Sequence, residues 1–158
     1  MINYKEKFEK TKLAGSIAAN TLDELCSYIR PGISTEDIDK LCFDFINDNN
    51  GFSAPLNYRG YPKSCCTSVN HVVCHGIPSS KILKEGDIIN VDVTSIYPKR
   101  MGKKGWYGDT SATFYVGEPA PLTKHLVEVT RQCLELGIQQ VKPGATLRDI
   151  GLVIQQFA

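Results

Sequence analysis

Three side chains between residues 72 and 109 have the chemistry of a metal-dependent site. His75 lies in a His-Gly-Ile-Pro turn, where glycine and proline fix the backbone and can aim a side chain. Asp92 lies inside the apolar run 88–94, where an unpaired carboxylate would cost several kcal/mol unless a cation bound it. Asp109 opens the next strand-like segment. Two carboxylates on neighbouring strands beside an imidazole are a common way to hold one or two divalent metal ions.

A predicted strand hairpin positions the two aspartates. Polar and apolar side chains alternate over residues 88–94, so that Asp92 shares a polar face with its second neighbours while the other face is apolar. Residues 106–116 read as the returning strand. The basic tip between the two strands, residues 99–104, is expected to be a solvated turn.

The segment before this hairpin reads as a loop followed by a strand. Residues 52–63 contain glycine, proline and two tyrosines, Tyr58 and Tyr61. Aromatic side chains on a loop leave two interpretations open, a hydrophobic plug over the core or the wall of an apolar pocket. β-Branched residues then predict a strand or hairpin over residues 65–75.

Helical periodicity is found on both sides of the strands. Apolar spacing predicts a helix over residues 4–30, which a proline-glycine turn ends, and a second helix that begins with a capping box at Ser34. The period returns over residues 122–141, and Thr146 caps a last helix. The strands are therefore expected to lie between two helix pairs in the chain order.

The end of the chain repeats its beginning at an offset of 112 residues. The matching pairs are Leu22 and Leu134, Ile29 and Val141, Asp37 and Asp149, Ile38 and Ile150, and Phe45 and Phe157. Generic stop and cap chemistry explains the shared turns but not the apolar positions in register, so the pattern favours a duplication. We predict a single domain, 1–158, in which 1–120 form a first pseudo-repeat and 121–158 begin a second.

Composition limits the classes of function. The formal net charge of +1 gives no overall field for DNA or an anionic membrane, and no apolar run approaches the roughly 20 residues of a membrane span. The charged N-terminus lacks the apolar core of a signal peptide, so the expected location is the cytoplasm. Six cysteines without a Cys-x-x-Cys pair predict reduced thiols rather than a disulfide framework or a structural zinc site.

Four motifs together resemble those of the type I methionine aminopeptidases. They are Tyr-Arg-Gly-Tyr-Pro-Lys-Ser at 58–64, Asn-His-Val-Val-Cys-His-Gly-Ile-Pro at 70–78, Gly-Asp-Ile-Ile-Asn-Val-Asp-Val-Thr at 86–94 and Gly-Asp-Thr-Ser at 108–111. The resemblance implies an α+β pita-bread fold, with an antiparallel sheet covered by helices in two related halves. It also implies hydrolysis of the first peptide bond of nascent proteins that begin with methionine and have a small second residue.

The resemblance also implies a role for individual residues. Asp92 and Asp109 would be metal ligands, and His75 would be a catalytic residue that contacts the substrate. The pocket for the methionine side chain would be lined by Tyr58, Tyr61 and Cys66. Asn90 and Val93 would lie at a monovalent cation held through backbone oxygens. Two divalent ions (Mn, Fe, Co or Zn) would lower the pKa of a water molecule and polarise the scissile carbonyl.

Two features depart from the pattern of that family. The hairpin between Asp92 and Asp109 is longer than in the usual bacterial enzyme, with the basic tip as the insertion. The family draws a histidine and two glutamates of its metal site, and a second substrate-contacting histidine, from a C-terminal half whose motifs are absent here. We therefore expect residues 1–158 to be an incomplete domain that ends inside an element and is a poor catalyst by itself. His125 is interpreted as a surface residue of a helix.

Other functions stay open at this point. A pita-bread homologue could act as a protein- or RNA-binding module, although both aspartates and His75 favour an enzyme. A hydrolase that uses Cys66 or Cys74 with His75 is a weaker interpretation, because adjacent strand residues such as Cys74 and His75 point apart. A relative of prolidase or aminopeptidase P is also a weaker interpretation. The loop at residues 58–64 (the tyrosine loop) and the turn that carries His75 (the histidine turn) resemble those of the methionine aminopeptidases instead. The charge of the basic tip allows a contact with ribosomal RNA.

Overall fold

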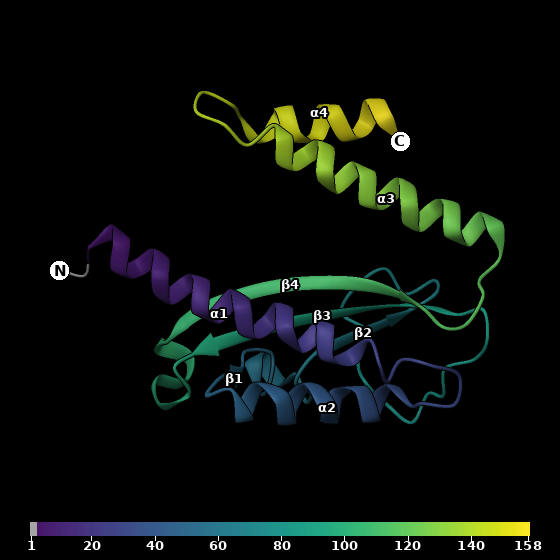
Figure 1. The fold of residues 1–158 in the computed structure, drawn as a ribbon, viewed down its shortest axis with the longest axis horizontal. Coiled ribbons are helices and arrows are strands. Elements are labelled where there is room, and N and C mark those ends of the chain that lie inside the picture. Colours follow the sequence, from purple (N-terminus) through teal and green to yellow (C-terminus); the bar gives the residue numbers. More distant parts are fainter. Residues whose placement is uncertain (1–2) are drawn as a thin grey trace. The chain divides into compact units, whose positions relative to one another are not determined.

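The computed structural model describes residues 3–158, and the chain divides into two compact units. The first unit ends at Glu118, and the second spans Pro119–Ala158. Their elements are drawn in Figure 1. The division lies close to the predicted boundary after residue 120, whereas the duplication itself stays a prediction.

The first unit contains a four-stranded antiparallel sheet. Its strands are β1 (Phe52–Ser53), β2 (Cys66–Val69), β3 (Ile88–Tyr97) and β4 (Trp106–Tyr115). β3 is central, because it pairs with β4 over its whole length and with β2 and β1 along its other edge. The predicted strand pair is confirmed. Of the strand or hairpin predicted over residues 65–75, the structure has the strand up to Val69, after which the chain turns at Asn70, whose φ of 53° is left-handed, and returns to bond Thr67 through Gly76.

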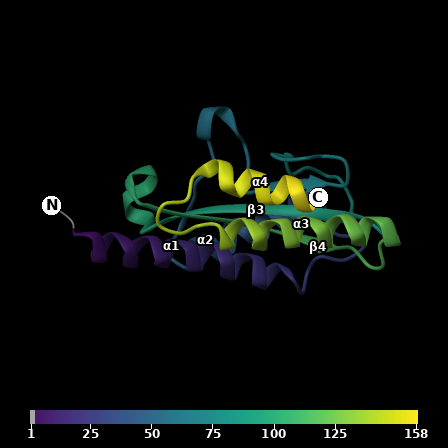
Figure 2. The same ribbon diagram turned by 90° about the horizontal axis from the view of Figure 1, so that it is seen from above.

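Two helices, α1 (Tyr4–Leu25) and α2 (Thr35–Asp48), pack against this sheet. Figure 2 shows α1 on one side of the sheet and the loop with the short 3₁₀ helix Tyr58–Gly60 on the other. α1 ends before residue 30, because the backbone N–H groups of Cys26 and Tyr28 bond to the third residue back instead of the fourth. α2 begins after Ser34 with the predicted capping box.

Burial along β3 alternates as its sequence predicts. Ile89, Val91 and Val93 are fully buried in the core that the two helices cover. The residues between them are only partly buried and form a polar face on the opposite side. The helices thus use one face of the sheet and leave the polar face for other contacts.

The fit between α1 and the sheet depends on a glycine of β4. A Cβ atom at Gly108 would lie 2.1 Å from the backbone nitrogen of Gly15 and 2.2 Å from the carbonyl carbon of Ala14. In the neighbouring strand, the buried Ser95 hydroxyl donates a hydrogen bond of 2.7 Å to the Ala14 carbonyl oxygen. Helix and strands are therefore in backbone contact immediately beside Asp109.

The second unit is a helix pair, α3 (Pro121–Gln139) and α4 (Leu147–Phe157). The helices pack together where Gly137 lies next to Ile150 and Ile154. α4 begins with the predicted capping box at Thr146. His125 is exposed on α3, as interpreted from the sequence.

Among the described residues, 3–158, every helix is too short or too polar to traverse a bilayer.

Candidate active site

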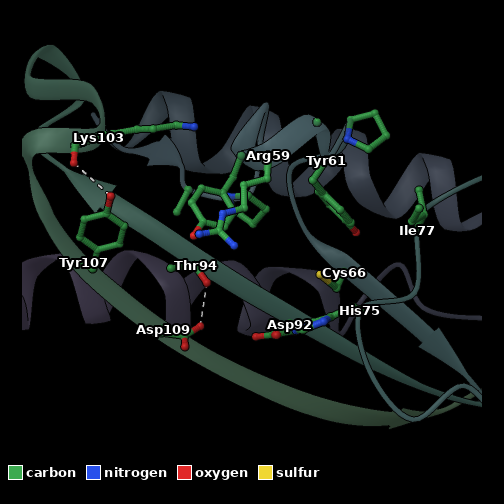
Figure 3. Close-up of a pocket in the computed structure, with 15 residues that line it drawn as sticks. Arg59, Tyr61, Cys66, His75, Ile77, Asp92, Thr94, Lys103, Tyr107 and Asp109 are labelled. Carbon is green, nitrogen blue, oxygen red and sulfur yellow. Dashed lines mark hydrogen bonds between the residues drawn. The ribbon is translucent and has the colours of Figure 1, made fainter.

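The two aspartates are neighbours on the polar face of β3 and β4 (Figure 3). Thr94 is the direct cross-strand partner of Asp109, and Asp92 precedes Thr94 by two residues, which makes the two carboxylates diagonal neighbours on one face. The Thr94 hydroxyl donates a hydrogen bond of 2.7 Å to Oδ1 of Asp109. The register of two regular strands therefore holds the carboxylates together.

The surroundings of Asp92 disfavour its ionised form. Burial raises the pKa of Asp92, the negative charge of Asp109 raises it further, and His75 opposes the shift. A divalent cation held by both carboxylates would offset their repulsion.

The residues of this site fit a divalent metal ion as a partial ligand set. Asp92 and Asp109 supply the oxygen donors that such ions accept. Within residues 3–158 no three His, Cys, Asp or Glu side chains are grouped so that they could hold a metal ion together. Complete coordination would therefore need ligands in addition to these two aspartates.

His75 lies in a turn that is fixed on β2. The Thr67 N–H group donates a hydrogen bond of 2.8 Å to the Gly76 carbonyl oxygen, and the Gly76 N–H group donates one of 3.2 Å to the Ser68 hydroxyl. A Cβ atom at position 76 would lie 2.1 Å from the Thr67 carbonyl oxygen, so only glycine fits there. This close approach places the imidazole at the edge of the polar face.

Tyr61 ties the tyrosine loop to the histidine turn. Its hydroxyl oxygen lies 2.9 Å from the carbonyl oxygen of Cys65 and 3.2 Å from that of Gly76, and these two acceptors share its single hydrogen. Burial is the main cause that raises the pKa of the Tyr61 phenol, which therefore stays a hydrogen-bond donor. The Asp39 carboxylate of α2 accepts the backbone N–H groups of Ser64, at 2.6 Å, and Cys65, at 3.2 Å. The start of β2 is thus fixed from both sides.

The backbone of His75 is strained, and this strain can be measured. Its φ of 55° lies in the left-handed region, which costs a residue with a Cβ atom about 1–2 kcal/mol. Glycine avoids that cost but loses more entropy on folding. We expect His75→Gly to be more stable than His75→Ala by roughly 0.5–1 kcal/mol in urea unfolding. If His75→Ala were equally stable, the left-handed turn would be wrong.

Six of the predicted site residues lie around one cavity of about 860 Å³, and Asn90 and Val93 do not line it. Its lining includes Tyr58, Tyr61, Cys66, His75, Asp92 and Asp109. Cys66 is nearly buried, at 8 % exposure, whereas Tyr58 is 55 % exposed and forms the rim. The predicted juxtaposition of the tyrosine loop with the two carboxylates is therefore present, and the roles of these residues remain predictions.

Cys66 has the properties of a lining residue. Burial makes the largest contribution to the raised pKa of the Cys66 thiol, and the nearby carboxylates of Asp92 and Asp109 raise this pKa further. Only the thiolate is a good nucleophile, and a raised pKa keeps the thiol protonated near neutral pH. This environment speaks against a Cys-His hydrolase that uses Cys66.

The two residues expected at a monovalent cation are not brought together. Asn90 and Val93 lie on opposite faces of β3, and both have cross-strand partners in β4. The Asn90 side chain contacts the hydroxyls of Ser111 and Thr113, at 3.4 and 3.2 Å. Carbonyl groups also alternate in direction along a strand, so those of residues 90 and 93 point to different neighbours. A monovalent cation at the backbone oxygens of Asn90 and Val93 stays a prediction.

The cavity also has lining residues that the sequence did not single out. They are Ala54, Pro55, Arg59, Gly60, Pro62, Ile77, Thr94, Lys103 and Tyr107. The tip of the hairpin is a short 3₁₀ helix, Lys99–Lys104, and its basic side chains are exposed as expected. The tip is more than a solvated turn, however, because Lys103 lines the cavity. The signal that could have indicated this was the length of the hairpin insertion.

Comparisons with known proteins agree with this geometry. The model of "Metallopeptidase family M24" matches residues 9–158. The chain is 49 % identical over 157 residues to the methionine aminopeptidase of Rickettsia prowazekii and 47 % identical over 158 residues to that of Escherichia coli K12. Each of these alignments covers 99 % of this chain and 58 % of the relative, so the chain spans somewhat more than half the length of both.

A solved structure gives the same likeness in three dimensions. The crystal structure of the Rickettsia prowazekii methionine aminopeptidase superposes with a TM-score of 0.92 at 48 % identity, over 99 % of this chain and 61 % of that one. The predicted α+β pita-bread fold and the resemblance to methionine aminopeptidases are thereby confirmed. The family is one of metallopeptidases, which accords with the paired carboxylates of β3 and β4. With its model matched over residues 9–158, the chain belongs to metallopeptidase family M24.

Proposed function

We propose that the protein is a metal-dependent methionine aminopeptidase, which removes the N-terminal methionine when the second residue is small. The observation that carries this proposal is the shared cavity, around which the tyrosine loop, the histidine turn and the paired carboxylates converge. Likeness to methionine aminopeptidases over 99 % of the chain supports it. The retained aspartates favour this activity over a binding module.

The residues that line the cavity would have different roles in binding the substrate. Tyr61 and Cys66 form the deeper apolar wall that would take the methionine side chain, and Tyr58 closes its rim. His75 is placed beside Asp92, where its imidazole would donate a hydrogen bond to the scissile peptide group. The strained turn that carries His75 keeps this donor oriented before the substrate arrives.

Asp92 and Asp109 would hold the divalent metal ions. When bound, such ions lower the pKa of water and polarise the carbonyl of the scissile bond. The resemblance places the remaining ligands, a histidine and two glutamates, in the C-terminal half of such enzymes. Oxygen and imidazole ligands suit Mn, Fe, Co or Zn.

The proposed substrates are nascent polypeptides, which makes the cytoplasm the expected compartment. The exposed lysines of residues 99–104 support a contact with ribosomal RNA, because they would be attracted to its phosphates.

The proposed function is tested by binding and turnover of matched peptides. The purified protein, supplied with Mn²⁺ or Co²⁺, is titrated calorimetrically with Met-Gly-Ser amide and with Lys-Gly-Ser amide, and released methionine is measured by mass spectrometry. We expect tighter binding of the methionine peptide and release that Asp109→Ala abolishes. Turnover should be slow with the two carboxylates of residues 3–158 as the metal ligands, so binding is the decisive measurement. Equal affinity for both peptides would refute the proposal.

A further inference from the structure

The cavity has a basic end that the carboxylates, the histidine turn and the methionine pocket do not explain. Arg59 and Lys103 both line it, and both side chains are exposed to solvent there. The Arg59 guanidinium carbon and the Lys103 ammonium nitrogen each lie 5.5 Å from the centre of the Tyr58 ring. Neither cation forms an ion pair with a carboxylate among residues 3–158. Two cations thus share one aromatic ring and keep their charge available to a ligand.

The local backbone holds both cations toward the cavity. Arg59 lies in a tight segment in which Asn57, Arg59 and Gly60 have positive φ values of 60°, 48° and 86° respectively. The Tyr107 hydroxyl donates a hydrogen bond of 3.0 Å to the Lys103 carbonyl oxygen, which anchors the hairpin tip to β4. Strained backbone is retained where a side chain must be aimed. Both cations are therefore part of the cavity wall.

Lys103 lies away from Asp92 along the strands, whereas Arg59 lies between the two, above Thr94 (Figure 3). Figure 3 shows Lys103 and Tyr107 at one end of the view and His75 with Cys66 at the other. Tyr107 pairs with Ile96 of β3, four residues beyond Asp92 and its cross-strand partner Cys66 of the methionine pocket, whereas Asp109 is two residues from Tyr107 on β4. The distance that matters for the methionine end of a substrate is the one from Asp92 and Cys66. At roughly 3.3 Å per residue this corresponds to about 13 Å. An extended peptide covers the same distance in about four residues.

We infer that Arg59 and Lys103 bind a carboxylate of the substrate, located about three to five residues from its N-terminus. The inference rests on the proposed function, which places the first residue between Tyr61 and His75. An acidic side chain at the fourth residue and the C-terminal carboxylate of a tetrapeptide carry the same chemistry. Guanidinium and ammonium groups attract either carboxylate, and the cavity is negative at Asp92 and Asp109 and positive at Arg59 and Lys103.

The test compares peptides that differ only in this carboxylate. Met-Gly-Ser-Glu-Ser amide is compared with Met-Gly-Ser-Gln-Ser amide, and Met-Gly-Ser-Ser free acid with its amide, by calorimetric titration. We expect each carboxylate peptide to bind about threefold to tenfold more tightly than its neutral partner at low salt. The first pair reports an acidic side chain, and the second reports a free C-terminus. The advantage should shrink in higher salt, because the cations are exposed.

Variants assign the effect to the two residues. In the double variant Arg59→Gln, Lys103→Gln the affinity ratio of each pair should fall to about one. Lys104→Gln, which removes a neighbouring charge of the same tip that does not line the cavity, should keep the full ratio. Circular dichroism confirms that each variant is folded.

The outcomes separate this inference from the proposed function. Methionine peptides that bind equally well with and without a carboxylate would overturn the inference and leave the proposed function standing. A preference that survives the double variant would overturn the assignment to Arg59 and Lys103. Failure of every methionine peptide to bind would refute the proposed function, and the inference with it.

Discussion

Replacing Asp109 by asparagine is expected to abolish Mn²⁺ binding to the cavity. The substitution removes one of two neighbouring carboxylates and keeps the size of the side chain. Loss of a group that merely orients a ligand costs about 10–100-fold in metal affinity, so loss of a ligand should cost about 100-fold or more. Electron paramagnetic resonance, which reports free Mn²⁺, measures the difference directly without turnover.

Two threonines on the same polar face provide a graded comparison. Thr94 donates its hydroxyl proton to Asp109, so Thr94→Val should weaken Mn²⁺ binding by about 10–100-fold. Thr113 lies on the same polar face, in β4. Among the described residues its hydroxyl has a hydrogen bond only with the Asn90 side-chain amide, and Thr113 does not line the cavity. Thr113→Val should therefore bind Mn²⁺ like the unchanged protein. Equal binding by Asp109→Asn and the unchanged protein would place the metal elsewhere.

Removing the other carboxylate should separate metal binding from stability. The raised pKa of Asp92 means that the fold disfavours its ionised form, so this group opposes folding at every pH above its unfolded pKa. A neutral Asp92→Asn side chain removes that opposition. In metal-free buffer at neutral pH its thermal midpoint should equal or exceed that of the unchanged protein, while Mn²⁺ binding is lost. A lower midpoint would show that Asp92 has a structural role.

The strand pair could be predicted because its pattern is local. Alternation along residues 88–94 assigned the polar face correctly, and Asp92 was conspicuous because a carboxylate interrupts an apolar run. The helix cap at Ser34 could be predicted for the same reason, since its partner Asp37 is three residues away in the sequence. Motifs within about ten residues were enough to identify the family. Such signals depend on neighbours in the chain, which the sequence displays.

The basic end of the cavity could not be predicted in the same way. Arg59 and Lys103 are 44 positions apart in the sequence and meet only because the tyrosine loop and the hairpin tip both lie on the polar face (Figure 3). Charged residues at a loop tip are ordinarily solvated, so the composition of the tip did not indicate a ligand-binding role. The sequence left a strand or a hairpin open over residues 65–75 and did not locate the turn at Asn70 that ends β2.

Gly108 illustrates a requirement that appears only in the folded protein. We expect Gly108→Ala to destabilise the protein by about 3 kcal/mol or more, at or above the upper end of overpacking effects. The added methyl group would meet the backbone of Ala14 and Gly15, within 2.1–2.5 Å, and backbone cannot turn away as a side chain can. The thermal midpoint should fall by roughly 6–12 °C.

Gly15, across the same contact, is the matched control. It lies inside α1, and a Cβ atom there would meet nothing within 4 Å. Gly15→Ala should therefore stabilise the protein by about 1 kcal/mol, because alanine is the better helix former. Two identical substitutions on facing segments thus have opposite expected signs, which differential scanning calorimetry can resolve. If Gly108→Ala were as stable as the unchanged protein, α1 could not lie against β4 at this point. The placement of Asp109 beside that contact would then also be wrong.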